Sequence, residues 1–387
     1  MIKISPETIT KKNIDNLREW LADYPRLTQY TEVQNFETHF ADWLKTKNAV
    51  FVNSGSSAIL LALSALREVR PLKKVIVPAV SWATDVSSLL HLGIEPIFCD
   101  SSIDDLNMDI GKLEQLFVDH QPDAIISISV MGLAPNMREI TRLCDKYCTT
   151  LIEDCCEGIG TQINGQKLGT FGAISVFSMY YSHQASSIEG GIVVTNDDNM
   201  ADIVRSMREH GWLRTCSLKY QQSKPLIYGK SMDAIGGLFT FYHPGFNMRN
   251  TDLNAFLATE QLSGIDAVIR QRDSHLRLYM KHIKAKGLWV PTISDDSEIV
   301  SALGYPMLVK NRDMLYAHLK AEGIESRPLI AGNITRQPFL ISKCRHVDLP
   351  VADIIHDNGI YLPLHQDMTD SDVLHVVETV LEVAEKL

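Results

Sequence analysis

A short polar segment with the sequence NSGSSA (residues 53–58) has the composition of a phosphate-binding turn. It follows an apolar strand-like run, LKTKNAVFVN, and opens a predicted helix over residues 57–67. Gly55, Ser56 and Ser57 would present backbone N–H groups and hydroxyls at the N-terminus of that helix, where phosphate groups are commonly held. Plain N-capping by serine is an equally good explanation of such a segment, so both interpretations stay open.

Three further polar residues lie at or just beyond the ends of later apolar runs. Ser178 lies near the end of ISVFSM (residues 174–179), where its hydroxyl could join the same phosphate or merely satisfy the strand end. Asp154 ends TTLIED, and a carboxylate in an apolar setting needs a cationic partner to stay ionised. A protonated pyridine nitrogen would be such a partner, and Glu157 could reach an oxygen of the same ring. The alternative for both acids is a helix N-cap with an acidic first turn.

Trp82 follows the predicted strand over residues 75–80, and its indole could stack over a flat ring at that edge of the sheet. Burial in the core is the competing interpretation, because it uses the same aromatic face. His183 lies in FSMYYSHQASSIEGG (residues 177–191). Its imidazole can take and give protons near neutral pH, but it cannot form the covalent bond that a lysine amine forms with an aldehyde carbon.

The composition limits the class of protein. The chain has 387 residues, 45% of them hydrophobic, which predicts two domains with ample cores. A net charge of −10 without long basic runs argues against nucleic-acid or anionic-membrane partners. No apolar run approaches the roughly 20 residues of a spanning helix, and the first residues lack the apolar core of a signal peptide. We therefore expect a cytoplasmic enzyme.

The seven cysteines are scattered, which suits a reducing compartment. Cys144 and Cys148 lie four apart on a predicted helix and could share a metal in principle. No second pair or nearby histidine completes a tetrahedral set, so ordinary packing is the favoured interpretation and no metal is expected.

Apolar strand-like runs alternate with amphipathic helices through the first part of the chain, which predicts an α/β domain with a mainly parallel sheet covered on both faces. The predicted strands are residues 75–80, 95–100, 124–130, 149–155, 174–179 and 191–196, and the clearest helices are 57–67, 82–92 and 137–146.

From about residue 251 the pattern changes to a smaller α+β region. It comprises a long helix over residues 253–284, short strands near 304–310, a helix over 312–322 and a closing helix over 371–387. We predict a large domain over residues 1–250, with a helical N-terminal arm, and a small domain over 251–387. HPGFNMRNTDLNAF (residues 243–256) lies at the boundary and could reach another subunit.

Together these segments, in this order and over nearly the whole chain, resemble the sugar-nucleotide aminotransferases of fold type I, which use pyridoxal 5′-phosphate (PLP). The resemblance is greatest to a 3-dehydratase branch in which a histidine replaces the cofactor-bonding lysine in a similar context. Other segments that carry it are VPAVSW, REHGW (residues 208–212), PGFN-R (244–249) and IESRP-IAGN (324–333).

The resemblance implies a role for each candidate residue. The phosphate would be held by Gly55, Ser56, Ser57 and Ser178, with Asn247 from the second subunit of a homodimer. Asp154 would pair with the pyridine nitrogen, Glu157 would contact the ring oxygen, and Trp82 would stack on the ring. His210 and Arg249 are candidates for substrate contact, and His183 would be the catalytic acid/base.

No lysine lies between Lys167 and Lys219, so no neighbour of His183 in this segment can take over the tether. The expected activity is therefore removal of the C3 hydroxyl from a 4-keto-6-deoxy sugar nucleotide, foremost the GDP-linked mannose derivative. PLP and its amine form, pyridoxamine 5′-phosphate (PMP), would bind non-covalently, and glutamate would restore PMP. The alternatives are an aminotransferase that uses His183 and a non-catalytic sugar-nucleotide-binding relative. An iron–sulfur 3-dehydrase is disfavoured, because only Cys216 and Cys344 follow His183.

Overall fold

The computed structural model describes residues 1–224, 239–294, 297–344 and 347–387. Its centre is a seven-stranded sheet in the order β1-β9-β8-β5-β4-β2-β3. Strand β9 runs antiparallel to both of its neighbours, and the remaining pairs are parallel. The predicted α/β class with a mainly parallel sheet is confirmed. The strands are β1 (Asn48–Val52), β2 (Lys74–Pro78), β3 (Glu95–Cys99), β4 (Ala124–Ile128), β5 (Thr150–Asp154), β8 (Ile174–Ser178) and β9 (Gly191–Thr195).

Helices cover both faces of this sheet, because alternate strand residues point to opposite sides. In β1, Val50 and Val52 pack on one face, whereas the Phe51 ring meets that of Phe36 on the other at 4.7 Å. The first face is covered by α3 (Gly55–Val69), α4 (Ala83–His91) and α7 (Asp198–Arg208). The second is covered by α2 (Thr31–Leu44), α5 (Ile110–His120), α6 (Met137–Tyr147) and α9 (Asp252–Leu262).

The N-terminal arm is helical, as predicted. Helix α1 (Lys11–Ala22) begins at Thr10, whose hydroxyl accepts a hydrogen bond from the Asn13 amide in a capping box. The arm is fixed to the rest of the molecule by Trp20, which stacks on Phe256 of α9 with ring centroids 5.0 Å apart.

The single long helix predicted over residues 253–284 was wrong. The chain forms α9 and then α10 (Ile265–Lys284), with a break at Ser263 and Gly264. The Ser263 hydroxyl donates back to the Glu260 carbonyl, and Gly264 has the weakest helix propensity after proline, so the backbone turns there. The apolar spacing continues across the break, which explains why the pattern concealed it.

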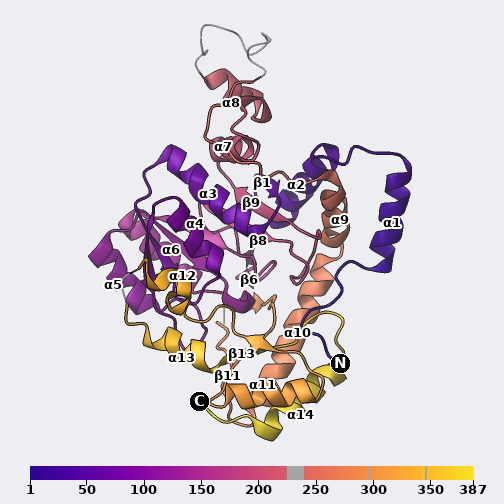
Figure 1. Cartoon of the computed structure of the whole chain (residues 1–387), viewed down its shortest axis with the longest axis vertical. Coiled ribbons are helices and arrows are strands. Elements are labelled where there is room, and N and C mark those ends of the chain that lie inside the picture. The colour runs from indigo at the N-terminus through magenta and orange to yellow at the C-terminus, as the bar shows by residue number, and fades with distance from the viewer. Residues whose placement is uncertain (225–238, 295–296, 345–346) are drawn as a thin grey trace.

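The C-terminal part forms a second sheet with the strand order β11-β13-β12. Figure 1 shows α10, α11, α14 and this sheet gathered at one end of the molecule, where both chain termini also lie. The predicted domain boundary near residue 250 stays a prediction. The elements are β11 (Tyr305–Leu308), α11 (Arg312–Ala321), β12 (Arg327–Pro328), α12 (Pro338–Ile341), α13 (Pro350–Asn358), β13 (Gly359–Leu362) and α14 (Asp370–Val383).

Smaller elements complete the described chain: β6 (Gln162–Ile163), β7 (Gln166–Lys167), α8 (Leu218–Ser223) and β10 (Ser297–Ile299). Among the helices described, none is long and apolar enough to cross a membrane. The seven cysteines are free thiols, with Cys144 buried and Cys148 exposed at the end of α6. Within the same residues, no group of three or more His, Cys, Asp or Glu side chains is arranged to hold a metal.

Candidate active site

A cavity of about 350 Å³ lies beyond the C-terminal ends of β5 and β8. Parallel strands end at the same edge of a sheet, and ligands of α/β proteins collect there. Of the predicted site residues, the cavity wall contains Gly55, Ser56, Trp82, Asp154, Glu157, Ser178 and His183. Residues that sequence reasoning did not select complete it, among them Ser54, Thr84, Asp85, Tyr180, Ser182, Glu189, Leu303, Arg327, Ile330 and Tyr361.

The start of α3 forms one wall of the cavity. Ser54 is the N-cap, and its hydroxyl oxygen accepts from the Ser57 amide at 3.0 Å and donates to the Ser57 hydroxyl at the same distance. Ser57 does not line the cavity, because both groups turn back to Ser54. Ser56 does line it, with its hydroxyl 3.1 Å from that of Thr84. A helix N-terminus at the wall of a cavity is suited to an anion.

Helix α3 and strand β8 approach each other so closely at Gly55 that a residue with a side chain would not fit there. A Cβ atom at this position would lie 2.9 Å from the Cβ of Ser178 and 3.0 Å from the Sγ of Cys156. The absence of a side chain therefore allows the helix start and the strand end to share one wall. Ser178 is buried at the end of β8, and its hydroxyl accepts from the Tyr180 amide at 3.3 Å.

The acidic residues after β5 are not helix caps, because the chain continues there in turns. Asp154 is buried, and its Oδ1 accepts a hydrogen bond of 2.8 Å from the Cys156 amide. Glu157 Oε2 accepts one of 2.6 Å from the Met131 amide. Burial is the main cause that raises the pKa of Glu157 to about 8, with a smaller effect from Asp154. Glu157 is therefore largely protonated at neutral pH and can donate a hydrogen bond to an oxygen atom.

Asp85, on α4, is a third carboxyl group at the same point, and sequence reasoning missed it. It is buried, and neither oxygen has a hydrogen bond of normal geometry within the described chain. Burial, followed by the neighbouring carboxylate of Asp154, raises its pKa well above the ordinary value. Little in the sequence indicates a site role for Asp85, because an aspartate in the first turn of a helix usually interacts favourably with the helix dipole and needs no other explanation.

His183 lies on the loop between β8 and β9, and its backbone amide donates to the Tyr180 carbonyl at 3.0 Å. The imidazole Nδ1 is shut off from solvent without a partner in the described residues, so Nε2 is the nitrogen available from the cavity. Burial, together with a smaller effect of the Arg272 charge, lowers the pKa of His183 to about 4. The side chain is therefore neutral at physiological pH, as a proton acceptor must be.

The loop that carries His183 is anchored by the residue that follows it. The next residue, Gln184, is buried, and its Nε2 donates to the carbonyls of Glu157 at 2.7 Å and Ser301 at 2.8 Å. Arg272 on α10 is fully buried, and its Nη1 donates to the carbonyls of three residues in the C-terminal part, Ala302, Leu303 and Leu364. These contacts connect the histidine loop with the segment that closes the cavity.

Trp82 precedes α4 and is 56% exposed, so its burial in the core is excluded. Its indole forms part of the cavity wall and is free to pack against a bound ring. The opposite wall comes from the C-terminal part and contains Leu303, Ile330, Tyr361 and Arg327. Arg327 lies within the motif over residues 324–333 that contributed to the predicted resemblance, and it supplies a positive charge for an anionic ligand.

Besides Ser57, three further predicted residues do not line this cavity. Asn247 is exposed and pairs through its backbone with Glu209. Arg249 forms an ion pair of 3.1 Å with Glu209, and the ring of His210 packs edge-on against Trp212 at 5.3 Å. The predicted roles of Asn247, His210 and Arg249 stay predictions, because Asn247 in particular is expected to serve the site of a partner subunit.

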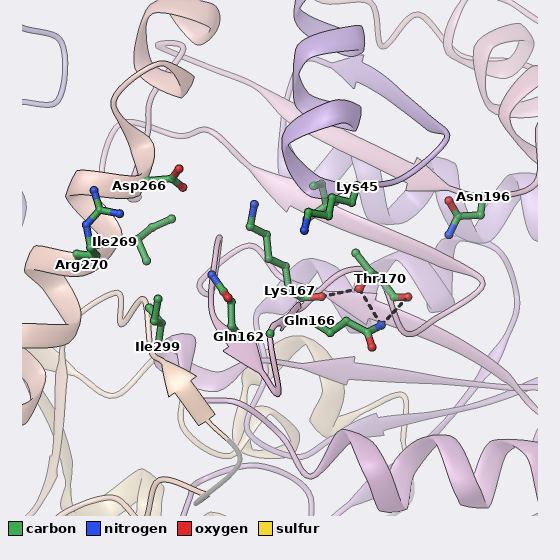
Figure 2. Close-up of a pocket in the computed structure, with 12 residues that line it drawn as sticks. Lys45, Gln162, Gln166, Lys167, Thr170, Asn196, Asp266, Ile269, Arg270 and Ile299 are labelled. Carbon is green, nitrogen blue, oxygen red and sulfur yellow. Dashed lines mark hydrogen bonds between the residues drawn. The ribbon is translucent and has the colours of Figure 1, made fainter.

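A second cavity, of about 540 Å³, lies between the β6–β7 hairpin, the end of α2 and the start of α10 (Figure 2). It contains Lys167, the lysine that precedes His183 most closely in the sequence. Lys167 Nζ lies 3.8 Å from the centre of the Trp43 ring and donates to the Trp43 carbonyl. The lysine that lies closest before His183 in the sequence is therefore held in a different cavity, which contains none of the predicted site residues.

The first cavity has the groups that a PLP molecule needs. A helix N-terminus with serine hydroxyls suits the phosphate, a buried carboxylate suits the protonated pyridine nitrogen, and a neutral carboxyl group suits the ring oxygen. The carboxyl oxygens of Asp85 have no hydrogen-bond partner among the described residues, and Gly55 lets the first turn of α3 lie directly against the end of β8, as a shared phosphate-binding wall requires. The fold is that of the PLP-dependent aminotransferases of fold type I.

Comparison with known proteins narrows this class. Residues 7–381 match the DegT/DnrJ/EryC1/StrS aminotransferase family, and the chain belongs to this family. It is 31% identical over 357 residues to a GDP-4-keto-6-deoxy-D-mannose 3-dehydratase of Escherichia coli O55:H7, covering 89% of this chain and 90% of that protein. It is 27% identical to a GDP-perosamine synthase of Vibrio cholerae, covering 89% and 88%.

A solved structure is similar over almost the full length. A crystal structure of GDP-4-keto-6-deoxymannose-3-dehydratase with a trapped PLP–glutamate adduct superimposes with a TM-score of 0.91 at 29% identity. The similarity covers 98% of this chain and 100% of that chain. The predicted resemblance to sugar aminotransferases of fold type I is confirmed.

Proposed function

We propose that this protein is a PLP/PMP-dependent 3-dehydratase of a 4-keto-6-deoxy sugar nucleotide, with GDP-4-keto-6-deoxymannose as the foremost candidate. In this reaction the C3 hydroxyl leaves as water and C3 receives hydrogen. Glutamate supplies the two electrons: its carbon skeleton leaves as the 2-keto acid and its nitrogen leaves as ammonia. The products are the 3-deoxy-4-keto sugar nucleotide, 2-oxoglutarate and ammonia.

One observation carries the proposal, namely that His183 stands at the cavity and no described lysine lines it. An aminotransferase of this class needs a lysine to capture the cofactor again and release an amino sugar. A histidine can move protons at the same place but cannot make that bond. Elimination followed by hydrolysis is the chemistry that remains available.

When bound, PMP supplies an amine for the C4 carbonyl and a ring that accepts electrons. The chain's own residues would hold that ring in place. The first turn of α3 and Ser178 bind the phosphate, with the partner subunit's Asn247. Asp154 keeps the pyridine nitrogen protonated, and Glu157 donates to the ring oxygen. Trp82 covers one face and excludes water from it.

His183 moves the protons. As a neutral base, its Nε2 would accept a proton at the carbon that bears the amine of the cofactor. The resulting imidazolium is a strong acid in this buried setting, because the environment that lowers the pKa of His183 to about 4 disfavours its charge. It can therefore give its proton to the departing C3 hydroxyl.

The relatives support the substrate class. The Escherichia coli relative is named for removing the C3 group of a GDP-linked 4-keto-6-deoxymannose. The similar crystal structure contains PLP joined to glutamate, which supports glutamate as the amine donor. Arg327 would meet the negative charge of glutamate or of the nucleotide. We also propose a homodimer, since Asn247 is exposed and lies outside its own cavity. A cytoplasmic location stays part of the same proposal.

The proposal is tested by supplying the protein with PLP and treating it with borohydride. The wild type should release all cofactor on denaturation, whereas His183→Lys should retain it. The protein is then given glutamate and the GDP-, CDP-, UDP- and dTDP-linked 4-keto sugars in turn. Ammonia and a 3-deoxy sugar should form with one of them, foremost the GDP sugar. A stable 4-amino sugar as the main product would overturn the proposal.

The second candidate is an aminotransferase that uses His183 in place of lysine. The GDP-perosamine synthase relative favours it, because that protein is named for producing an amino sugar from the same kind of nucleotide. The same assay separates the two candidates by the fate of the amino group.

A further inference from the structure

The carboxyl group of Asp85 is buried beside that of Asp154, and no cation is among the groups that act on it most strongly. Asp85 lies in the first turn of α4, and Asp154 ends β5. They lie within hydrogen-bonding reach of each other, and both side chains line the cavity. Both Asp85 oxygens are closed to solvent, and no donor among the described residues completes a hydrogen bond of normal geometry with either.

The groups around Asp85 make its ionised form unfavourable. Asp154 and Glu157 are the titratable neighbours that act on it most strongly, and both are acidic. Cys156, in the turn after Asp154, is partly buried, and the backbone amide of Trp82 stabilises the ionised form of Asp85 only weakly. His183 and Arg327 line the same cavity, but neither is among the main influences on Asp85. Two facing carboxylates repel each other, and they attract only when one carries a proton.

We propose that Asp85 and Asp154 form a carboxyl pair that shares one proton, with Asp85 as the neutral member that donates its O–H to Asp154. The Cys156 amide binds Asp154 at Oδ1, so the Asp85 proton gives Asp154 a second fixed contact. Asp85 is therefore a positioning residue, and it acts on the cofactor through Asp154. This inference rests on the proposed function in one respect: the pyridinium N–H is the group that the pair is placed to receive.

The pair also sets the charge of the site. With Asp85 neutral, one negative charge on Asp154 faces one positive charge on the ring, and the buried cluster is balanced. Asp85→Asn preserves a donor toward Asp154 but cannot titrate. Asp85→Ala removes the donor and leaves Asp154 with the Cys156 amide. The two variants thus separate the hydrogen bond from the titratable proton.

The first test uses the protein without cofactor. Infrared difference spectra of the wild type at neutral pH should contain the C=O band of a protonated carboxyl group that is absent from Asp85→Asn. As the pH rises, Asp85 of the wild type loses its proton in the unfolded chain before it does so in the folded protein. The unfolded state is thereby favoured and the free energy of unfolding falls. Asp85→Asn has no such proton, so its stability does not fall for this reason. The melting temperature of the variant should therefore exceed that of the wild type by a margin that grows with pH. If neither the infrared band nor the pH-dependent difference in melting temperature is observed, the proposed carboxyl pair is wrong.

The second test measures PMP binding by absorbance titration between pH 6 and pH 9. Loss of a charge-supporting hydrogen bond should weaken binding by Asp85→Ala about tenfold, and Asp85→Asn should restore most of it near neutral pH. A dissociation constant equal to wild type in Asp85→Ala would contradict the positioning role. If the infrared band is present and the wild type does not bind PMP either, the carboxyl pair stands and the proposed function fails. If the wild type and both variants bind PMP equally well and the infrared band is missing, the carboxyl pair fails and the proposed function stands.

Discussion

Gly55 at the start of α3 and Ser178 at the end of β8 touch so closely that a Cβ atom on residue 55 would lie 2.9 Å from the Cβ of Ser178. This contact joins the helix N-terminus to the strand end and so builds one wall of the cavity. The geometry of this proposed phosphate site therefore depends on the lack of a side chain as much as on the serine hydroxyls.

We expect Gly55→Ala to separate α3 from β8, lower the stability by about 1–3 kcal/mol and weaken PMP binding. The measurements are thermal unfolding and a PMP titration. Gly264→Ala is the matched control, because a Cβ there meets no atom within 4 Å. Equal PMP affinity in the Gly55→Ala variant and the wild type would show that the close contact does not shape the phosphate site.

His183→Asn should reduce kcat by a factor of about 10²–10⁴ while PMP binding stays near the wild-type value. Asparagine is similar in size and polarity but cannot accept a proton. Steady-state release of ammonia and a binding titration check the two parts. A variant that still turns over at close to the wild-type rate would exclude His183 as the base.

The pH profile of kcat/KM should have two limbs. Activity should fall as the pH approaches about 4, where His183 takes up a proton and stops acting as a base. It should also fall above about pH 8, where Glu157 loses the proton that it donates to the ring oxygen. Glu157→Gln keeps a donor that does not ionise, so the alkaline limb should disappear in this variant. An unchanged alkaline limb would mean that another group causes it.

Arg272→Met should lower the free energy of unfolding by about 2 kcal/mol or more, because it removes hydrogen bonds to three carbonyl groups in a buried place. Urea denaturation measures the change. Arg270→Met, two residues earlier on α10, is the control, and its exposed side chain predicts a change within about 0.5 kcal/mol. Similar losses in both variants would argue against a special role for the buried guanidinium.

The sequence was a good guide to the fold where local patterns decide it. The runs that became β4 and β8 are fully buried, and each consists of apolar residues with one or two serines, so they leave few alternatives to central strands. The break between α9 and α10 was missed, since a serine and a glycine interrupt the backbone without interrupting the apolar spacing.

The site was predictable only in part, for a similar reason. Asp154, Ser178 and Gly55 could be selected because each lies at the end of an element whose place at the sheet edge follows from the topology. Asp85 and Arg327 could not, since their importance comes from contacts with segments remote in the sequence. No local pattern distinguishes Asp85 from an aspartate that only favours a helix start.

The central claim is that a histidine at position 183 directs the reaction to elimination, and the fate of the glutamate nitrogen tests it most directly. The protein is given ¹⁵N-glutamate with GDP-4-keto-6-deoxymannose, and the label is followed by NMR through several turnovers. We predict that ¹⁵N appears in ammonia in equal amount to the 3-deoxy product and that the sugar nucleotide carries none. Label retained at C4 of the sugar as the main product would contradict the account.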